Sequence, residues 1–168
     1  MKKLFLLIAL SAATLCAGAQ ARFGYFSYDA VLQSMPECAT VKHDLDQLRQ
    51  KYDAELRRAE TEFNAKYEEF LDGQRDFAPA ILRKRQAELQ EIVEKNAAFR
   101  KESERLLQQA GDDAYRPLRR RLDAAVAKVG QARAYEFVLN TDSNACPYIS
   151  PAAGEDATPY IKSQLGLQ

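Results

Sequence analysis

The feature that most constrains this chain is a pair of long amphipathic segments separated by one short break. Between residues 37 and 131, large apolar residues recur every three or four positions, and charged or polar residues fill the positions between them. That spacing keeps a narrow apolar stripe on one side of an α-helix. Two such helices can seal one seam, but they cannot enclose a globular core. In the first segment the stripe comprises Leu45, Leu48, Tyr52, Leu56, Ala59, Phe63, Tyr67 and Phe70.

The break between the two segments predicts a helical hairpin. Gly73 interrupts the pattern and suits a helix end, and Pro79 suits the first turn of a new helix. The sequence therefore predicts an antiparallel hairpin over residues 37–131 with its tip at about 73–78. At 1.5 Å per residue, one limb would extend roughly 50 Å. Gly111 and Pro117 in the return limb favour a bend, which is either static or a working hinge.

Short segments at both ends of the chain predict a small β-rich body made of residues 22–36 and 132–168. The pattern predicts strands at 22–28, 134–140 and 146–149, the last limited to an edge by Pro147. Helix starts are predicted where Asp29 precedes a brief turn, where Ser34 and Glu37 form a capping box before the first limb, and where Thr158 precedes Pro159. The fold class is thus α+β and mostly helical.

So small a body predicts self-association. Its strands carry apolar residues on both faces, and alone it would leave open edges and exposed aromatic rings. We expect several copies to close their strands into a shared barrel from which the hairpins project. The candidate oligomerisation residues are Phe23, Tyr25, Phe26, Phe137 and Leu139.

The first 21 residues predict a secretory signal peptide. Lys2 and Lys3 precede a short apolar run, and residues 19–21, Ala-Gln-Ala, match a small-x-small cleavage site. We expect cleavage after Ala21 and a soluble exported product. Cys16 suggests lipidation instead, but Leu15 before it is too large for a lipobox.

Charge argues against nucleic acid as a partner. Without Lys2 and Lys3, 22 of the 24 Lys and Arg residues remain against 24 Asp and Glu, whereas phosphate binding needs a clear basic excess. The limbs differ in sign, with net charges of −4 over residues 37–76 and +4 over residues 77–131. Antiparallel limbs of opposite sign are expected to attract each other weakly.

The two cysteines beyond the leader leave two alternatives open. Cys38 and Cys146 both lie near the predicted base of the hairpin, and an exported protein permits a disulfide between them. They lack a Cys-x-x-Cys spacing, so two separate thiols are the other alternative.

The sequence offers no catalytic, cofactor-binding or metal-binding constellation. His43 is the only histidine, and it lies on a charged helix face with no second ligand at metal-binding spacing. There is no phosphate loop, nucleophile elbow or dinucleotide fingerprint. We therefore expect no enzyme.

Three binding or structural functions remain. A holdase would use aromatic side chains near the tip, namely Phe63, Tyr67, Phe70 and Phe77, although these residues could instead seal the seam. A coiled-coil spacer or adaptor of the cell envelope would need a stricter heptad than the one present. A membrane-surface binder would use the basic cluster of Arg116, Arg119, Arg120 and Arg121, which more often covers nearby carboxylates.

The ordered combination resembles the Skp/OmpH family of periplasmic chaperones for outer-membrane proteins. The residues that carry the resemblance are 23–28 leading to 32–37, the charged hairpin, 117–129 leading to 135–139, and the final helix of 156–165. The resemblance implies a homotrimer with a nine-stranded barrel, three tentacles that enclose unfolded outer-membrane proteins, and no need for ATP. The chain is less basic than many members, so only Arg83, Lys84 and Arg85 are carried over as a candidate basic tip for lipopolysaccharide or a membrane surface.

Overall fold

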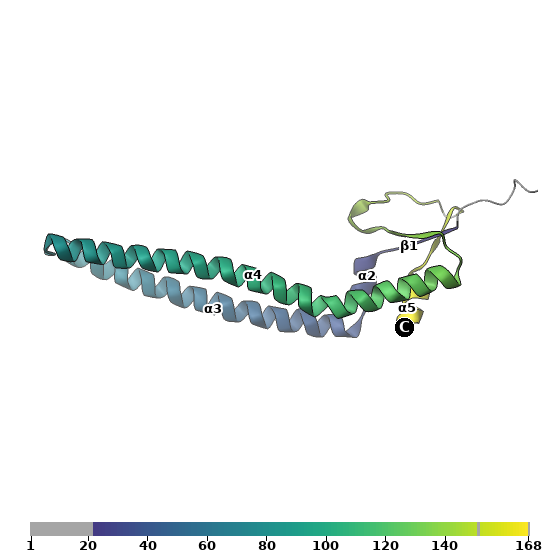
Figure 1. The fold of residues 1–168 in the computed structure, drawn as a ribbon, viewed down its shortest axis with the longest axis horizontal. Coiled ribbons are helices and arrows are strands. Elements are labelled where there is room, and N and C mark those ends of the chain that lie inside the picture. The colour runs from purple at the N-terminus through teal and green to yellow at the C-terminus, as the bar shows by residue number, and fades with distance from the viewer. Residues whose placement is uncertain (1–21, 151, 168) are drawn as a thin grey trace, which may run out of the picture. The chain divides into compact units, whose positions relative to one another are not determined.

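The described residues of this computed structural model are 22–150 and 152–167, and they form a mostly helical α+β fold (Figure 1). The predicted signal peptide and its cleavage site after Ala21 lie outside them. The predicted fold class and the long hairpin are confirmed. In chain order, the elements are β1 (Phe23–Phe26), α2 (Tyr28–Gln33), α3 (Pro36–Gly73), α4 (Pro79–Ala132), β2 (Phe137–Asn140), the 3-10 turn η1 (Asp142–Asn144), β3 (Gly154–Asp156) and α5 (Thr158–Leu165).

The chain divides into two compact units. The hairpin unit comprises residues 35–119, and the body unit comprises the described residues before 35 and from 120 onward. Helix α4 contributes to both, because it continues through Gly111 and Pro117 without ending. The predicted boundaries assigned residues 120–131 to the hairpin, whereas their contacts group them with the body.

In the hairpin unit, α3 and α4 lie side by side (Figure 1) and are joined by apolar and polar contacts. The ring of Tyr52 meets the ring of Phe99 edge-on at 6.2 Å between centroids. The Asn96 side-chain amide donates a hydrogen bond of 3.3 Å to the carbonyl oxygen of Ala59. Ser103 is buried, and its hydroxyl donates to the carbonyl oxygen of Phe99 at 2.8 Å. The apolar stripes therefore meet in one seam, as their spacing predicts.

The body unit contains a three-stranded parallel sheet in the order β2-β1-β3. Phe23 in the central strand lies opposite Phe137 in β2 and Gly154 in β3. The buried apolar residues of this unit come from β1, α2, the end of α4, and α5 with the residue before it. They are Phe26, Val31, Leu32, Leu122, Ala125, Val129, Ala157, Ile161 and Leu165.

The predicted third strand at residues 146–149 is wrong. That stretch has no strand, and β3 instead occupies Gly154–Asp156, which the sequence assigned to a loop. Pro147 lacks the backbone N–H that a ladder needs. At Gly154, an added Cβ would lie 2.5 Å from the ring of Phe23, so a residue without a side chain lets this strand approach β1.

The predicted helix caps are also wrong. The N-cap of α2 is Ser27, whose hydroxyl accepts a hydrogen bond of 3.1 Å from the backbone N–H of Ala30, so Asp29 lies inside the helix. Ser34 forms no capping box, because it ends α2 and its hydroxyl donates to the carbonyl of Val31. Helix α3 starts after Met35 with no side-chain cap. Likewise, Ala157 and not Thr158 is the N-cap of α5.

Across the part of the chain that the structure describes, no helix combines the length and the apolar character that a membrane crossing requires.

Candidate functional site

Exposed large apolar residues are frequent in the outer part of the hairpin unit. Of the seven large apolar residues that are most exposed among those described, four lie there: Tyr67, Leu71, Ile81 and Val93. Each of these four side chains is between 42% and 48% exposed. Adjacent exposed apolar groups mark interaction sites, and on α3 Tyr67 and Leu71 lie four residues apart on one helix face. The outer hairpin is therefore a candidate binding surface.

Part of this surface is a row along α3 that we call the apolar row, made of Phe63, Tyr67 and Leu71. Residues four positions apart in a helix lie on the same face, one above the other. The rings of Phe63 and Tyr67 stack with 5.8 Å between their centroids and an interplanar angle of 13°. Phe63 is half-buried, while Tyr67 and Leu71 are exposed.

The two other predicted client-binding residues, Phe70 and Phe77, pack against each other at the tip. Their ring centroids are 6.3 Å apart, and both residues are half-buried. An added Cβ at Gly73 would lie 2.5 Å from the Phe77 ring, so this glycine serves a close approach. The gap beside these rings has a volume of only about 20 Å³. It has room for about one water molecule and cannot receive a client side chain.

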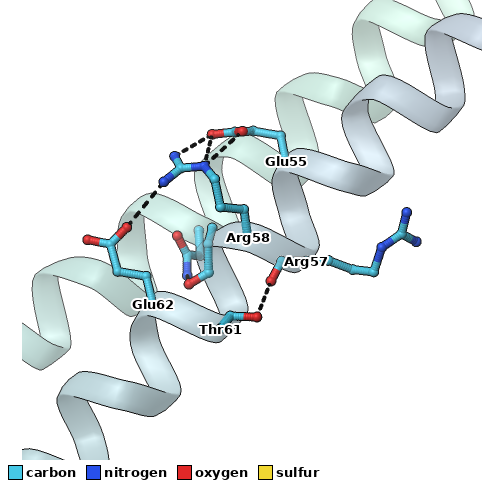
Figure 2. A network of polar contacts seen from close by, with 7 residues as sticks. Glu55, Arg57, Arg58, Thr61 and Glu62 are labelled. Carbon is cyan, nitrogen blue, oxygen red and sulfur yellow. Dashed lines mark hydrogen bonds and ion pairs between the residues drawn. The ribbon is translucent and has the colours of Figure 1, made fainter.

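The ion pairs among the described residues of the hairpin mostly join side chains of one helix. Figure 2 shows Arg58 between Glu55 and Glu62, with Arg58 Nε 3.0 Å from Glu55 and Nη1 3.5 Å from Glu62. Hydrogen bonding from Arg58 holds the pKa of Glu55 below its usual value. A contact of 3.8 Å between Arg85 and Glu69 connects the two helices. The predicted attraction between limbs of opposite sign thus rests on few direct contacts.

The predicted basic tip is largely neutralised. Lys84 Nζ lies 3.7 Å from Glu88, and Arg85 lies 3.2 Å from the same carboxylate besides contacting Glu69. Two of its three cations therefore have carboxylate partners within the hairpin, which weakens the case for a phosphate-rich surface as the ligand.

The body unit has a half-exposed aromatic face on its sheet. Phe23 stacks on Phe137 with 5.2 Å between centroids, and the register places Tyr25 opposite Leu139 on the same face. Phe137 is 47% exposed. Phe26, the fifth predicted oligomerisation residue, lies on the opposite face and is buried within the body.

Glu155 in β3 binds three side chains of the body unit, in a cluster that the sequence did not indicate. Its carboxylate accepts hydrogen bonds from the hydroxyls of Tyr135 at 2.5 Å and Tyr160 at 3.0 Å, and it pairs with Arg133. The Arg133 guanidinium also lies 4.0 Å from the centroid of the Tyr160 ring. These hydrogen bonds, that from Tyr135 foremost, hold the pKa of Glu155 below its usual value. The cluster ties β3 and α5 to the rest of the body.

The described residues contain no metal-binding cluster. Residues 22–150 and 152–167 hold no group of three or more His, Cys, Asp or Glu placed to bind a metal. His43 is exposed and shares a hydrogen bond of 2.8 Å with Gln47. Cys38, buried in the hairpin unit, and Cys146, half-buried in the body unit, are both free thiols.

The comparisons with known proteins agree with one another. The family described as "Outer membrane protein (OmpH-like)" matches residues 22–165. Among solved structures, the chain is similar to a proposed OmpH-like outer membrane chaperone from Caulobacter crescentus, with 18% identity and a TM-score of 0.67. That match covers 89% of this chain and 86% of the other. No curated protein sequence matches significantly.

Proposed function

The chain belongs to the family of OmpH-like outer membrane proteins, a family of chaperones and not of enzymes, and from this premise we propose that it is a periplasmic holdase. It would bind unfolded outer-membrane proteins and prevent their aggregation without ATP. The observation that carries the proposal is the exposed apolar surface of the outer hairpin, with Tyr67, Leu71 and Ile81 between 42% and 48% exposed. Periplasmic location follows from the same family membership and from the predicted signal peptide.

The distribution of charge supports reversible binding. The apolar row lies among charged side chains that stay in water, so a client can gain apolar contact without being enclosed in a dry pocket. A client that folds buries its own apolar residues and loses its affinity for the surface. Release then needs no nucleotide. The protein binds only the unfolded client, so folding of the client removes the bound form.

We further propose that the protein acts as a homotrimer assembled through the half-exposed aromatic face of the body. Phe23, Tyr25, Phe137 and Leu139 would make this contact, whereas Phe26 is 4% exposed within one chain and has almost no area left to contribute. Light scattering of the processed protein should give about three chains per particle. A monomer at working concentration would contradict the assembly and any enclosure of clients.

An aggregation assay tests the holdase directly. A urea-unfolded outer-membrane barrel is diluted into buffer, and turbidity is followed with and without the protein. In the test variant, Tyr67, Leu71 and Ile81 are all replaced by Ala. Ala is a good helix former, so the helices are preserved while exposed apolar area is removed, and protection should fall severalfold. Tyr148→Ala is the matched control, because Tyr148 is 81% exposed but lies in the body.

Two results would count against the holdase proposal. One is turbidity that rises equally with and without the wild-type protein, which would favour a spacer or adaptor. The other is full protection by the triple variant, which would move client contact away from the outer hairpin.

A further inference from the structure

A row of acidic and amide side chains runs beside the apolar row on α3. On one side of the apolar row, the neighbours of each residue on the helix surface are the residues three positions before it and one position after it. For Phe63, Tyr67 and Leu71 those neighbours are three carboxylates and one amide, and all of them are exposed. They are Glu60, Asn64, Glu68 and Asp72.

In the part of the chain that the structure describes, the carboxylates of this row lack the cationic partners that three nearby carboxylates have. Glu55 and Glu62 contact Arg58, and Glu69 contacts Arg85. By contrast, Glu60, Glu68 and Asp72 form no ion pair within the described residues. Three negative charges therefore lie in one row on the surface, next to exposed apolar side chains, with Asn64 between the first two.

The other side of the apolar row is close to neutral. Moving around α3 toward the seam, the next positions include Lys66 and Phe70, and Phe70 packs on Phe77. Across the seam, Glu88 holds Lys84 and Arg85 in ion pairs. Between residues 60 and 72, Lys66 stands against five carboxylates, of which Glu62 and Glu69 are paired with arginines. Negative charge therefore predominates along the apolar row.

From this placement, and resting on the proposed holdase function, we propose that the outer part of α3 selects unfolded segments that combine alternating large apolar residues with Lys or Arg. Side chains four residues apart in a helix are separated by about 6 Å along its axis. In an extended chain, side chains on one face are separated by about 6.6–6.8 Å. An extended client segment can therefore place successive apolar side chains on Phe63, Tyr67 and Leu71.

The cations of such a segment would pair with the acidic row. Lys and Arg carry long flexible stems that lie on apolar surface while the charged end reaches a carboxylate. Pairs of this exposed kind each contribute little, and three together correspond to about tenfold in affinity at low salt. The same charges repel acidic segments, so the surface discriminates as well as attracts.

Peptide binding to the full-length processed protein tests the proposal. Three fluorescent peptides of about sixty residues are long enough to contact several hairpins of one particle, so their later contacts are intramolecular. They share Leu and Tyr at alternate positions and differ at three intervening positions in each twelve-residue repeat, which are Lys, Ser or Glu. Fluorescence anisotropy at low salt should rank affinity as Lys, then Ser, then Glu, with about tenfold or more between the extremes. The difference should shrink as salt is added, because exposed charges are screened.

Two triple variants separate the acidic row from the general charge of the hairpin. Glu60→Gln with Glu68→Gln and Asp72→Asn should bring the three peptides to within about twofold of one another. The control changes net charge equally, with Asp44→Asn, Asp53→Asn and Glu104→Gln, at exposed positions of the hairpin outside the row. It should keep the wild-type ranking.

The outcomes distinguish this proposal from the holdase proposal. Equal binding of the three peptides by the wild type, or equal loss of ranking in both triple variants, would overturn the selectivity while protection in the turbidity assay persists. Absence of both peptide binding and protection would overturn the two proposals together.

Discussion

The glycine at the centre of the sheet gives a sharp test of how the body unit is packed. Gly24 is buried in β1, and an added Cβ there would lie 2.7 Å from the Tyr135 ring, 3.0 Å from a second atom of that ring, and 3.1 Å from Cβ of Ala157. Real side chains almost never approach so closely. Tyr135 has little freedom to retreat, because its hydroxyl donates to Glu155 at 2.5 Å.

The expected cost of Gly24→Ala follows from these contacts. Forcing an extra carbon into a packed site destabilises a protein by about 1–3 kcal/mol. Displacement of Tyr135 would also break its hydrogen bond to Glu155, which moves the loss toward the upper end of that range. For a chain of this size, such a loss lowers the midpoint of thermal unfolding by about 2–10 °C.

Gly130→Ala is the matched control, because it makes the same substitution in the same unit. Gly130 lies inside α4, and the nearest atom to an added Cβ is Val138 Cγ2 at 3.9 Å. Ala is preferred over Gly in a helix interior, so this variant should gain about 0.5–1 kcal/mol. The two substitutions should therefore move stability in opposite directions.

Urea unfolding followed by the near-ultraviolet circular dichroism of tyrosine measures both variants. Five of the eight tyrosines lie in the body, at positions 25, 28, 135, 148 and 160, so the signal reports on this unit. A Gly24→Ala midpoint equal to or above that of the wild type, with the Gly130→Ala gain present, would refute the packing argument.

Three other sites give further predictions. Because the folded-state pKa of Glu155 is held below its ordinary value of 4.5, its stabilisation is present above that pH and is lost as the pH falls through the folded pKa. The urea midpoint, measured between about pH 3 and pH 7, should therefore decrease more steeply with falling pH for the wild type than for Glu155→Gln. An equal decrease in the two proteins would contradict this. Gly73→Ala should displace the Phe77 ring and speed amide hydrogen exchange at the tip, while exchange around Asn96 stays unchanged. Leu122→Ala removes a fully buried side chain and should cost about 2–5 kcal/mol in urea unfolding, against less than about 0.5 kcal/mol for exposed Arg120→Ala.

The sequence predicted the two long helices, the strands β1 and β2 and helix α5, and it missed the third strand and the helix caps, which depend on single contacts. The two limbs repeat an apolar residue every three or four positions, so their helices and the break at Gly73 follow from the pattern. β3 consists of Gly154, Glu155 and Asp156, which read as a turn by composition. Its place in the sheet depends on the Phe23 ring filling the space above Gly154.

The candidate site divides in the same way. Helical spacing identifies Phe63, Tyr67, Phe70 and Phe77 as apolar residues near the tip, but it cannot say which of them the opposite helix covers. The structure places Phe70 against Phe77 and leaves Tyr67 exposed. Leu71 and Ile81 were missed because they fall outside the narrow apolar stripe. A search for apolar residues at helix positions next to the stripe would have found Leu71.

The exposed area of one hairpin limits what a single copy could hold. Full burial of a large apolar side chain contributes about 1.5–3 kcal/mol, so Tyr67 and Leu71, at 44% and 42% exposure, could each contribute about 1 kcal/mol. With Phe63 and Ile81 the total is about 3–4 kcal/mol, whereas association itself costs about 4 kcal/mol or more. One outer hairpin therefore cannot retain a client through these residues alone, but several hairpins acting on one chain can, because the later contacts are intramolecular. A body variant that dissociates the assembly, such as Phe137→Glu, should lose protection although its hairpin is unchanged. Full protection by a monomer would show that this apolar surface does not hold the client.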